Sequence, residues 1–147
     1  MAKLDNMGGI ISADFIFPDE IELFTPFADK CTISLIEGAA WKNIKMQHQG
    51  FTMKVTPKNE NAGKIFSISG SVNLLPDNEY LNLLQEEFYI LLRYQLSDMN
   101  YKVAGTNLYP LSYTIEPLDP GKPSGFHGYK LSFEGKQVFA PPFLLIV

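Results

Sequence analysis

Apolar and polar residues alternate along much of this chain. The alternation is strictest over 51–56, 65–74 and 111–116; in the second run Phe66 and Ile68 fall on one face, with serines on the other. A period of two residues is typical of a β-strand with one buried and one exposed face. These runs therefore predict antiparallel strands.

Turn-forming residues separate the runs. The stretch 57–64 carries Pro, Asn and Gly and predicts the turn of a hairpin, while 117–125 is too rich in proline and glycine for regular structure. Further strands are expected at four places: 10–17, 31–36, 101–105 and 129–138. The first two are weaker candidates, and Pro18 and Pro26 separate them.

One helix is expected to begin after Pro76. Asp77 can cap its free backbone amides, Glu79 suits its first turn, and apolar residues follow at helical spacing. Two alternatives exist beyond Glu87: the helix continues through 88–96, or that segment forms a strand. Aromatic and branched residues crowd the segment, so the strand is favoured.

The order of these elements indicates the fold class. We expect about seven or eight short strands and one short helix, with the strands following one another directly. This order predicts a mainly β fold: an antiparallel β-sandwich or barrel with one short flanking α-helix. The length of 147 residues predicts a single domain, 1–147, in which the N-terminal segment 1–30 and the C-terminal tail 137–147 are candidate assembly arms.

Composition narrows the partners and the compartment. The net charge of −4 does not suit a protein that binds nucleic acid through a dense positive face. No apolar run approaches the ~20 residues of a membrane-spanning helix, and the first residues do not form a signal peptide. We therefore expect synthesis in a cytoplasm, without recognition of a nucleic-acid sequence and without membrane insertion.

Few residues offer catalytic chemistry. A Cys–His catalytic pair could use only Cys31 as the nucleophile and His48 or His127 as the base. The spacing of these residues does not imply contact. One cysteine with two distant histidines does not make a structural zinc site, and no phosphate loop is present. We expect no enzyme activity and assign no catalytic, metal-binding or cofactor-binding residue.

The last five residues, 143–147, are all apolar and follow two prolines. Fully burying one such side chain stabilises a protein by about 1.5–3 kcal/mol, so together they represent on the order of 10 kcal/mol. Two alternatives stay open: the tail is the final strand of its own sheet, or it crosses to a neighbouring subunit. The candidate assembly interface consists of Phe139, Phe143, Leu144, Leu145, Ile146 and Val147.

Three segments resemble a known pattern. A Gly-Thr turn with Pro-Leu at 105–111, a Gly-Tyr strand at 128–135 and the apolar 140–144 are similar to small structural proteins encoded in prophages of gut anaerobes. The resemblance implies a virion subunit of the tail or neck, similar to a tail-tube protein. It would be made in the host cytoplasm and would assemble as a homo-oligomeric ring or tube with other virion proteins.

A different class of function is the alternative. Trp41 and several Tyr and Phe residues lie on apolar faces, and they could line the mouth of a barrel that binds a small ligand or a peptide. Packing in the core is the ordinary role of such residues, so the structural subunit is favoured.

Overall fold

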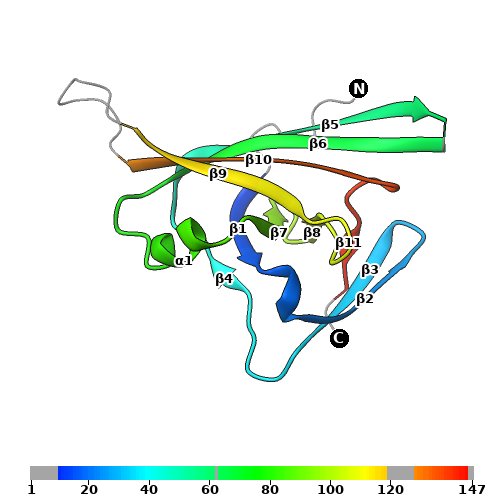
Figure 1. The fold of residues 1–147 in the computed structure, drawn as a ribbon, viewed down its shortest axis with the longest axis horizontal. Coiled ribbons are helices and arrows are strands. Elements are labelled where there is room, and N and C mark those ends of the chain that lie inside the picture. Colours follow the sequence, from blue (N-terminus) through cyan, green and yellow to red (C-terminus); the bar gives the residue numbers. More distant parts are fainter. Residues whose placement is uncertain (1–9, 62, 119–127, 146–147) are drawn as a thin grey trace.

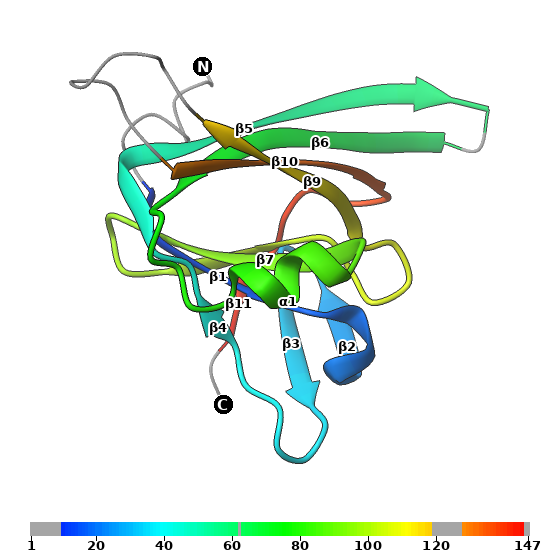
Figure 2. The same ribbon diagram turned by 60° about the vertical axis from the view of Figure 1, so that its left-hand side comes forward.

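The computed structural model describes residues 10–61, 63–118 and 128–145. Within them strands occupy 64% of the residues and helices 7%, which confirms a mainly β fold with one short α-helix. The eleven described strands form one mixed sheet that is not closed into a barrel. The sheet folds over itself into two layers with a hydrophobic core between them (Figures 1 and 2).

The upper layer is antiparallel and has the order β9-β10-β6-β5. Its strands are β5 (Met46–Glu60), β6 (Gly63–Leu74), β9 (Leu111–Leu118) and β10 (Gly128–Gln137). The alternation predicted from the sequence is confirmed, because Phe51, Ile68 and Leu131 are buried while the serines between such residues lie on the outer face. Small hydroxyl side chains thus cover the outside of this layer.

The β5–β6 hairpin is longer than the sequence predicts. The strands continue through most of 57–64 and pair as far as Glu60 and Gly63. Pro57 is tolerated because β5 is an edge strand, which has a side without ladder partners. Beyond the pairing of Phe66 with Gln137, the hairpin projects past its neighbour β10 (Figure 1).

The lower layer continues the sheet through seven strands. They are β1 (Ile10–Ile16), β2 (Ile21–Phe27), β3 (Lys30–Leu35), β4 (Lys42–Asn43), β7 (Tyr89–Leu96), β8 (Tyr101–Ala104) and β11 (Phe143–Leu144). β7 lies between β1 and β8, and its first residues, Tyr89 and Ile90, also pair with β9. The segment 88–96 is therefore a strand, as favoured, and it joins the two layers.

The helix begins later than the sequence predicts. Helix α1 (Leu81–Glu86) starts after Tyr80, not at Asp77. The buried Asn78 is the reason, because its side-chain oxygen accepts a hydrogen bond from the Tyr80 amide at 3.1 Å and holds the chain in a turn. Leu84 is buried in the core, and its carbonyl accepts a hydrogen bond from the Tyr113 hydroxyl.

Strand β2 lies outside the strands that the sequence predicts, because Pro26 indicates a break. The strand tolerates this proline since it lies at the other open edge of the sheet. The β2–β3 hairpin curls over the outside of β7 and β8 and closes a second apolar cluster, which includes Cys31, Leu91 and Val103. We call this group the outer cluster. In the described part of the chain, no helix has the length and apolar character needed to cross a membrane.

Candidate assembly surface

The C-terminal segment enters the sheet of its own subunit. Strand β11 (Phe143–Leu144) lies parallel to β3 and antiparallel to β8. The Phe143 amide donates to the Asp29 carbonyl at 2.9 Å, and the Leu145 amide donates to the Cys31 carbonyl at 2.9 Å. Residues 143–145 therefore belong to the sheet of their own subunit, which is the first of the two alternatives for the tail. Ile146 and Val147 lie outside the described residues.

Successive side chains of this segment point to opposite faces. Leu144 packs into the outer cluster beside Cys31. Phe143 and Leu145 lie on the other face, where the Lys102 ammonium is 4.8 Å from the centre of the Phe143 ring. Leu144 therefore contributes to the stability of the subunit, while its two neighbours face outward.

The outward residues share a face of the sheet with apolar residues of β2, and the polar side chains of β3 lie between them. The register places Phe27 opposite Lys30 and Lys30 opposite Phe143, so these three side chains share one face. Leu23 and Leu145 lie on the same face, and Leu23 is 58% exposed. We call the surface formed by Leu23, Phe27, Phe143 and Leu145 the β2–β3–β11 face.

A shallow hollow of about 260 Å³ adjoins this face. It is lined by Asp29, Lys30, Asn100, Tyr101, Phe143, Leu144 and Leu145. Its lining is apolar along the C-terminal segment and polar at Asp29, Lys30 and Asn100. A hollow of this size beside exposed apolar residues can receive a side chain from another protein.

Phe139 lies apart from the other predicted residues. Its ring stacks on Phe24 with 6.4 Å between ring centres. The buried Gln137 holds the backbone here: its side-chain oxygen accepts from the Gly105 amide at 2.9 Å, and its amide donates to the Phe139 carbonyl at 2.8 Å. Phe139 thus lines the rim of the outer cluster and is not part of the β2–β3–β11 face.

Leu23 and Phe27 are the surface residues that the sequence reasoning missed. The spacing of two residues predicts that Leu23 and Phe27 share a face if the segment is a strand, but 21–27 has no strict apolar and polar alternation to indicate one. Their position beside Phe143 depends on the parallel pairing of β3 with β11, which joins segments far apart in the chain. Local periodicity carries no information on such a pairing.

The residues considered for catalysis do not form a site. The Cys31 side chain is fully buried, and burial raises the pKa of its thiol from 9.0 to about 11, so the reactive thiolate is disfavoured. The side chain of His48 and all of His127 lie outside the described residues. Among the side chains that the structure describes, no cluster of three or more His, Cys, Asp or Glu could hold a metal ion.

An ion pair joins two strands of the lower layer. Arg93 of β7 donates to the same Asp14 carboxylate oxygen through Nε at 2.9 Å and Nη2 at 2.6 Å. Its guanidinium lies 4.9 Å from the ring of Trp41 and 4.7 Å from that of Tyr101. The pair joins β1 to β7 and so positions these two strands. Trp41 packs here and does not line a barrel mouth.

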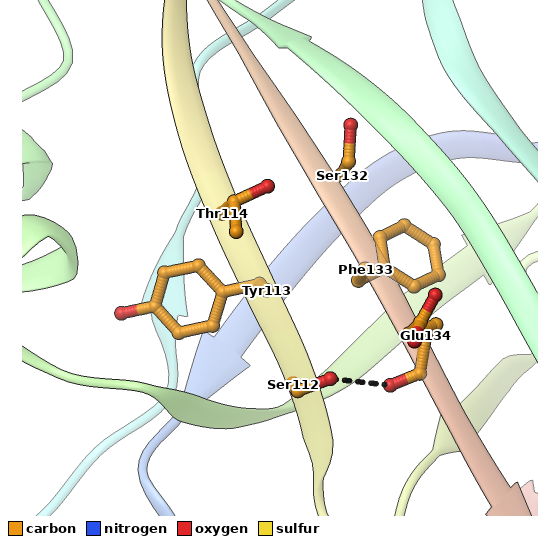
Figure 3. Close-up of a pocket in the computed structure, with 6 residues that line it drawn as sticks. All are labelled: Ser112, Tyr113, Thr114, Ser132, Phe133 and Glu134. Carbon is orange, nitrogen blue, oxygen red and sulfur yellow. Dashed lines mark hydrogen bonds between the residues drawn. The ribbon is translucent and has the colours of Figure 1, made fainter.

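The outer face of the upper layer is polar. The register places Thr52, Ser71, Ser132 and Thr114 in one row across β5, β6, β10 and β9. A shallow hollow of about 260 Å³ lies at β9 and β10. Figure 3 draws the residues that line it, among them Ser112, whose hydroxyl donates to the Glu134 backbone carbonyl at 3.3 Å. Hydroxyl groups, rather than apolar side chains, dominate this side of the molecule.

Comparisons with known proteins identify no relative: no protein-family model, curated protein or solved structure matches the chain.

Proposed function

We propose that this protein is a structural subunit of a phage virion, a tail or neck component similar to a tail-tube protein, which assembles through the β2–β3–β11 face. The observation that supports it is the placement of four outward apolar side chains, two from β2 and two from the C-terminal segment, on one face of the sheet, with the polar Lys30, Thr32 and Ser34 of β3 between the two pairs. Clustered apolar side chains on a surface mark protein–protein contacts more often than isolated ones do. The likeness of 105–111 and 128–135 to prophage structural proteins supplies the virion context.

The energetics favour contacts repeated in a ring. Covering a half-exposed Leu or Phe stabilises an interface by on the order of 1 kcal/mol, so one copy of this face holds a neighbour weakly. In a closed ring, one surface of each subunit contacts a different surface of the next subunit. The same contact is therefore repeated at every subunit. The proposed partners are therefore further copies of this chain, together with other virion proteins.

The open edges of the sheet offer additional contacts. In the described structure β5 pairs only with β6, and β2 pairs only with β3. Pro26 in β2 and Pro57 in β5 each remove one backbone donor, which limits unregulated pairing of edges. The projecting part of the β5–β6 hairpin is the element best placed to reach a subunit of the next ring (Figure 2).

A pair of leucine variants tests the proposal. Leu23→Asp places a charge on the β2–β3–β11 face, while Leu108→Asp places one on a leucine that is 78% exposed elsewhere. We expect the wild type and Leu108→Asp to form rings or tubes by electron microscopy and light scattering. We expect Leu23→Asp to stay monomeric with an unchanged circular dichroism spectrum.

Two results would contradict the proposal. One is a wild-type protein that stays monomeric at high concentration and binds no other virion component. The other is a Leu23→Asp variant that assembles as readily as Leu108→Asp does.

A further inference from the structure

A second hollow lies on the outer face of the upper layer. It has a volume of about 410 Å³, within the roughly 300–1,000 Å³ of small-molecule sites. It is lined by Ser67, Ile68, Ser69, Tyr89, Pro110, Ser112, Glu134, Gly135 and Lys136. Ser112 and Glu134 also line the hollow of Figure 3, so the two form one shallow groove across β9 and β10.

Strand register explains the shape of this groove. Ser69 lies opposite Glu134, Glu134 opposite Ser112, and Ser112 opposite Tyr89, so these four side chains form a row across β6, β10, β9 and β7. Serine side chains are short, whereas those of Glu134 and Tyr89 are long. The serines therefore form the floor, and the tyrosine forms a wall at one end. A site on strands of a regular sheet is held more rigidly than one on loops.

The chemistry of the lining distinguishes between ligands. Serine hydroxyls supply both donors and acceptors, and the Glu134 and Lys136 charges offset each other. Tyr89 is 53% exposed and presents an apolar ring with a polar tip. An apolar ligand would leave the hydroxyls without partners, and a charged ligand would meet a like charge. A sugar offers what these groups need, since it has many hydroxyls and one apolar C–H face.

We propose that this groove binds a neutral oligosaccharide, with one sugar ring against Tyr89 and its hydroxyls bonded to Glu134 and the serines. The backbone groups beneath it are paired within the sheet, so an extended peptide could not bind here by adding a strand. This inference does not depend on the proposed virion role, because the lining residues are distinct from those of the β2–β3–β11 face.

Calorimetric titration of the full chain tests the inference. The probes are maltohexaose, cellohexaose and chitohexaose, with a sialylated and a sulfated oligosaccharide for comparison. We expect at least one neutral probe to bind the wild type, and binding to be at least tenfold weaker in Tyr89→Ala. Tyr109→Ala is the matched control, because Tyr109 is 57% exposed but does not line the groove. It should bind as the wild type does.

A second variant tests the groove independently of Tyr89. Ser69→Arg fills the floor of the groove from an exposed position and should also abolish binding. Leu23→Asp should keep full binding, so loss of assembly and loss of sugar binding are distinguishable. The inference is overturned if no neutral probe binds, if the charged probes bind more tightly, or if Tyr109→Ala and Tyr89→Ala weaken binding equally.

Discussion

The Cys31 thiol lies between the C-terminal segment and the outer faces of β7 and β8, with no exposed surface. Burial disfavours its charged form and raises its pKa to about 11. In the folded protein it is therefore a small apolar residue that fills space. Ionisation of this thiol still affects how the stability of the protein depends on pH.

We predict that Cys31 lowers the stability of the protein in alkaline solution. Below pH 9 the thiol is protonated in both states, and its full contribution is present. As the pH rises from 9.0 towards 11, the unfolded chain loses this proton while the folded chain retains it, so unfolding becomes more favourable by on the order of 2 kcal/mol. Urea denaturation of the wild type and Cys31→Ala across this range measures the effect.

The comparison with Cys31→Ala isolates this group. Every other side chain is the same in both proteins, so only the difference between the two curves belongs to the thiol. The variant should be less stable at neutral pH, because it leaves a small cavity, and less sensitive to alkali. Parallel curves for the two proteins would contradict the prediction.

At the residue scale, sequence reasoning reached some positions and missed others. It placed Cys31 in a strand, at the start of the weaker candidate 31–36, and the structure confirms this. It did not find the Arg93–Asp14 pair or the rings of Trp41 and Tyr101 beside it. These residues come from four separate segments, and only the pairing of β1, β7 and β8 brings them together.

Strand β11 is short, yet it lies in the interior of the lower layer between β3 and β8. Its neighbours would each lose a ladder of backbone hydrogen bonds without it. The same segment presents Phe143 and Leu145 to the solvent. Folding and association therefore depend on adjacent side chains of one segment.

We predict that Leu144→Ala and Leu145→Ala have different effects. Leu144 packs into the outer cluster, so its truncation should lower the free energy of unfolding by about 2 kcal/mol. Leu145 is exposed, so its truncation should cost less than about 0.5 kcal/mol and mainly weaken self-association. Urea denaturation and sedimentation velocity measure the two quantities. Equal losses of stability would contradict the assigned faces.

At the element scale, regular alternation was a dependable guide and single prolines were not. The runs at 51–56, 65–74 and 111–116 all lie within strands, because a sheet with one buried face requires this pattern. Pro26 concealed β2 and Pro57 shortened the predicted hairpin, since an edge strand tolerates proline where an interior strand does not. Asp77 suggested a cap, but the Asn78 side chain delayed the helix.

The two layers share one strand, and this determines how the whole molecule unfolds. Ile90 and Leu92 of β7 lie in the central core, while Leu91 between them lies in the outer cluster. Loss of β7 therefore removes both apolar clusters together. The two layers are parts of one cooperative unit.

We predict that the protein unfolds in a single transition. Trp41 is the only tryptophan of the chain and packs against the outer cluster, so its fluorescence reports on that side alone. Far-ultraviolet circular dichroism reports on all strands. The two urea curves should coincide. An earlier fluorescence transition would show that the β2–β3 hairpin separates from the sandwich first.

At the scale of the whole molecule, the fold class was predictable and the topology was not. A run of strands without intervening helices indicates an antiparallel, layered protein. The choice between a sandwich and a barrel depends on which edges meet, and here β2 and β5 stay open. No local signal predicts that β11 lies parallel to β3. This pairing joins β11 to strands that lie much earlier in the chain.

The position of β11 has a consequence for folding in the cell. It leaves the ribosome after every other described strand, yet it occupies a place between β3 and β8. In a nascent chain β3 and β8 therefore each keep one unpaired edge until translation has passed Leu144. Such long-range closure is slow and exposes edges that bind other chains. We expect chaperones to engage this protein late in its synthesis.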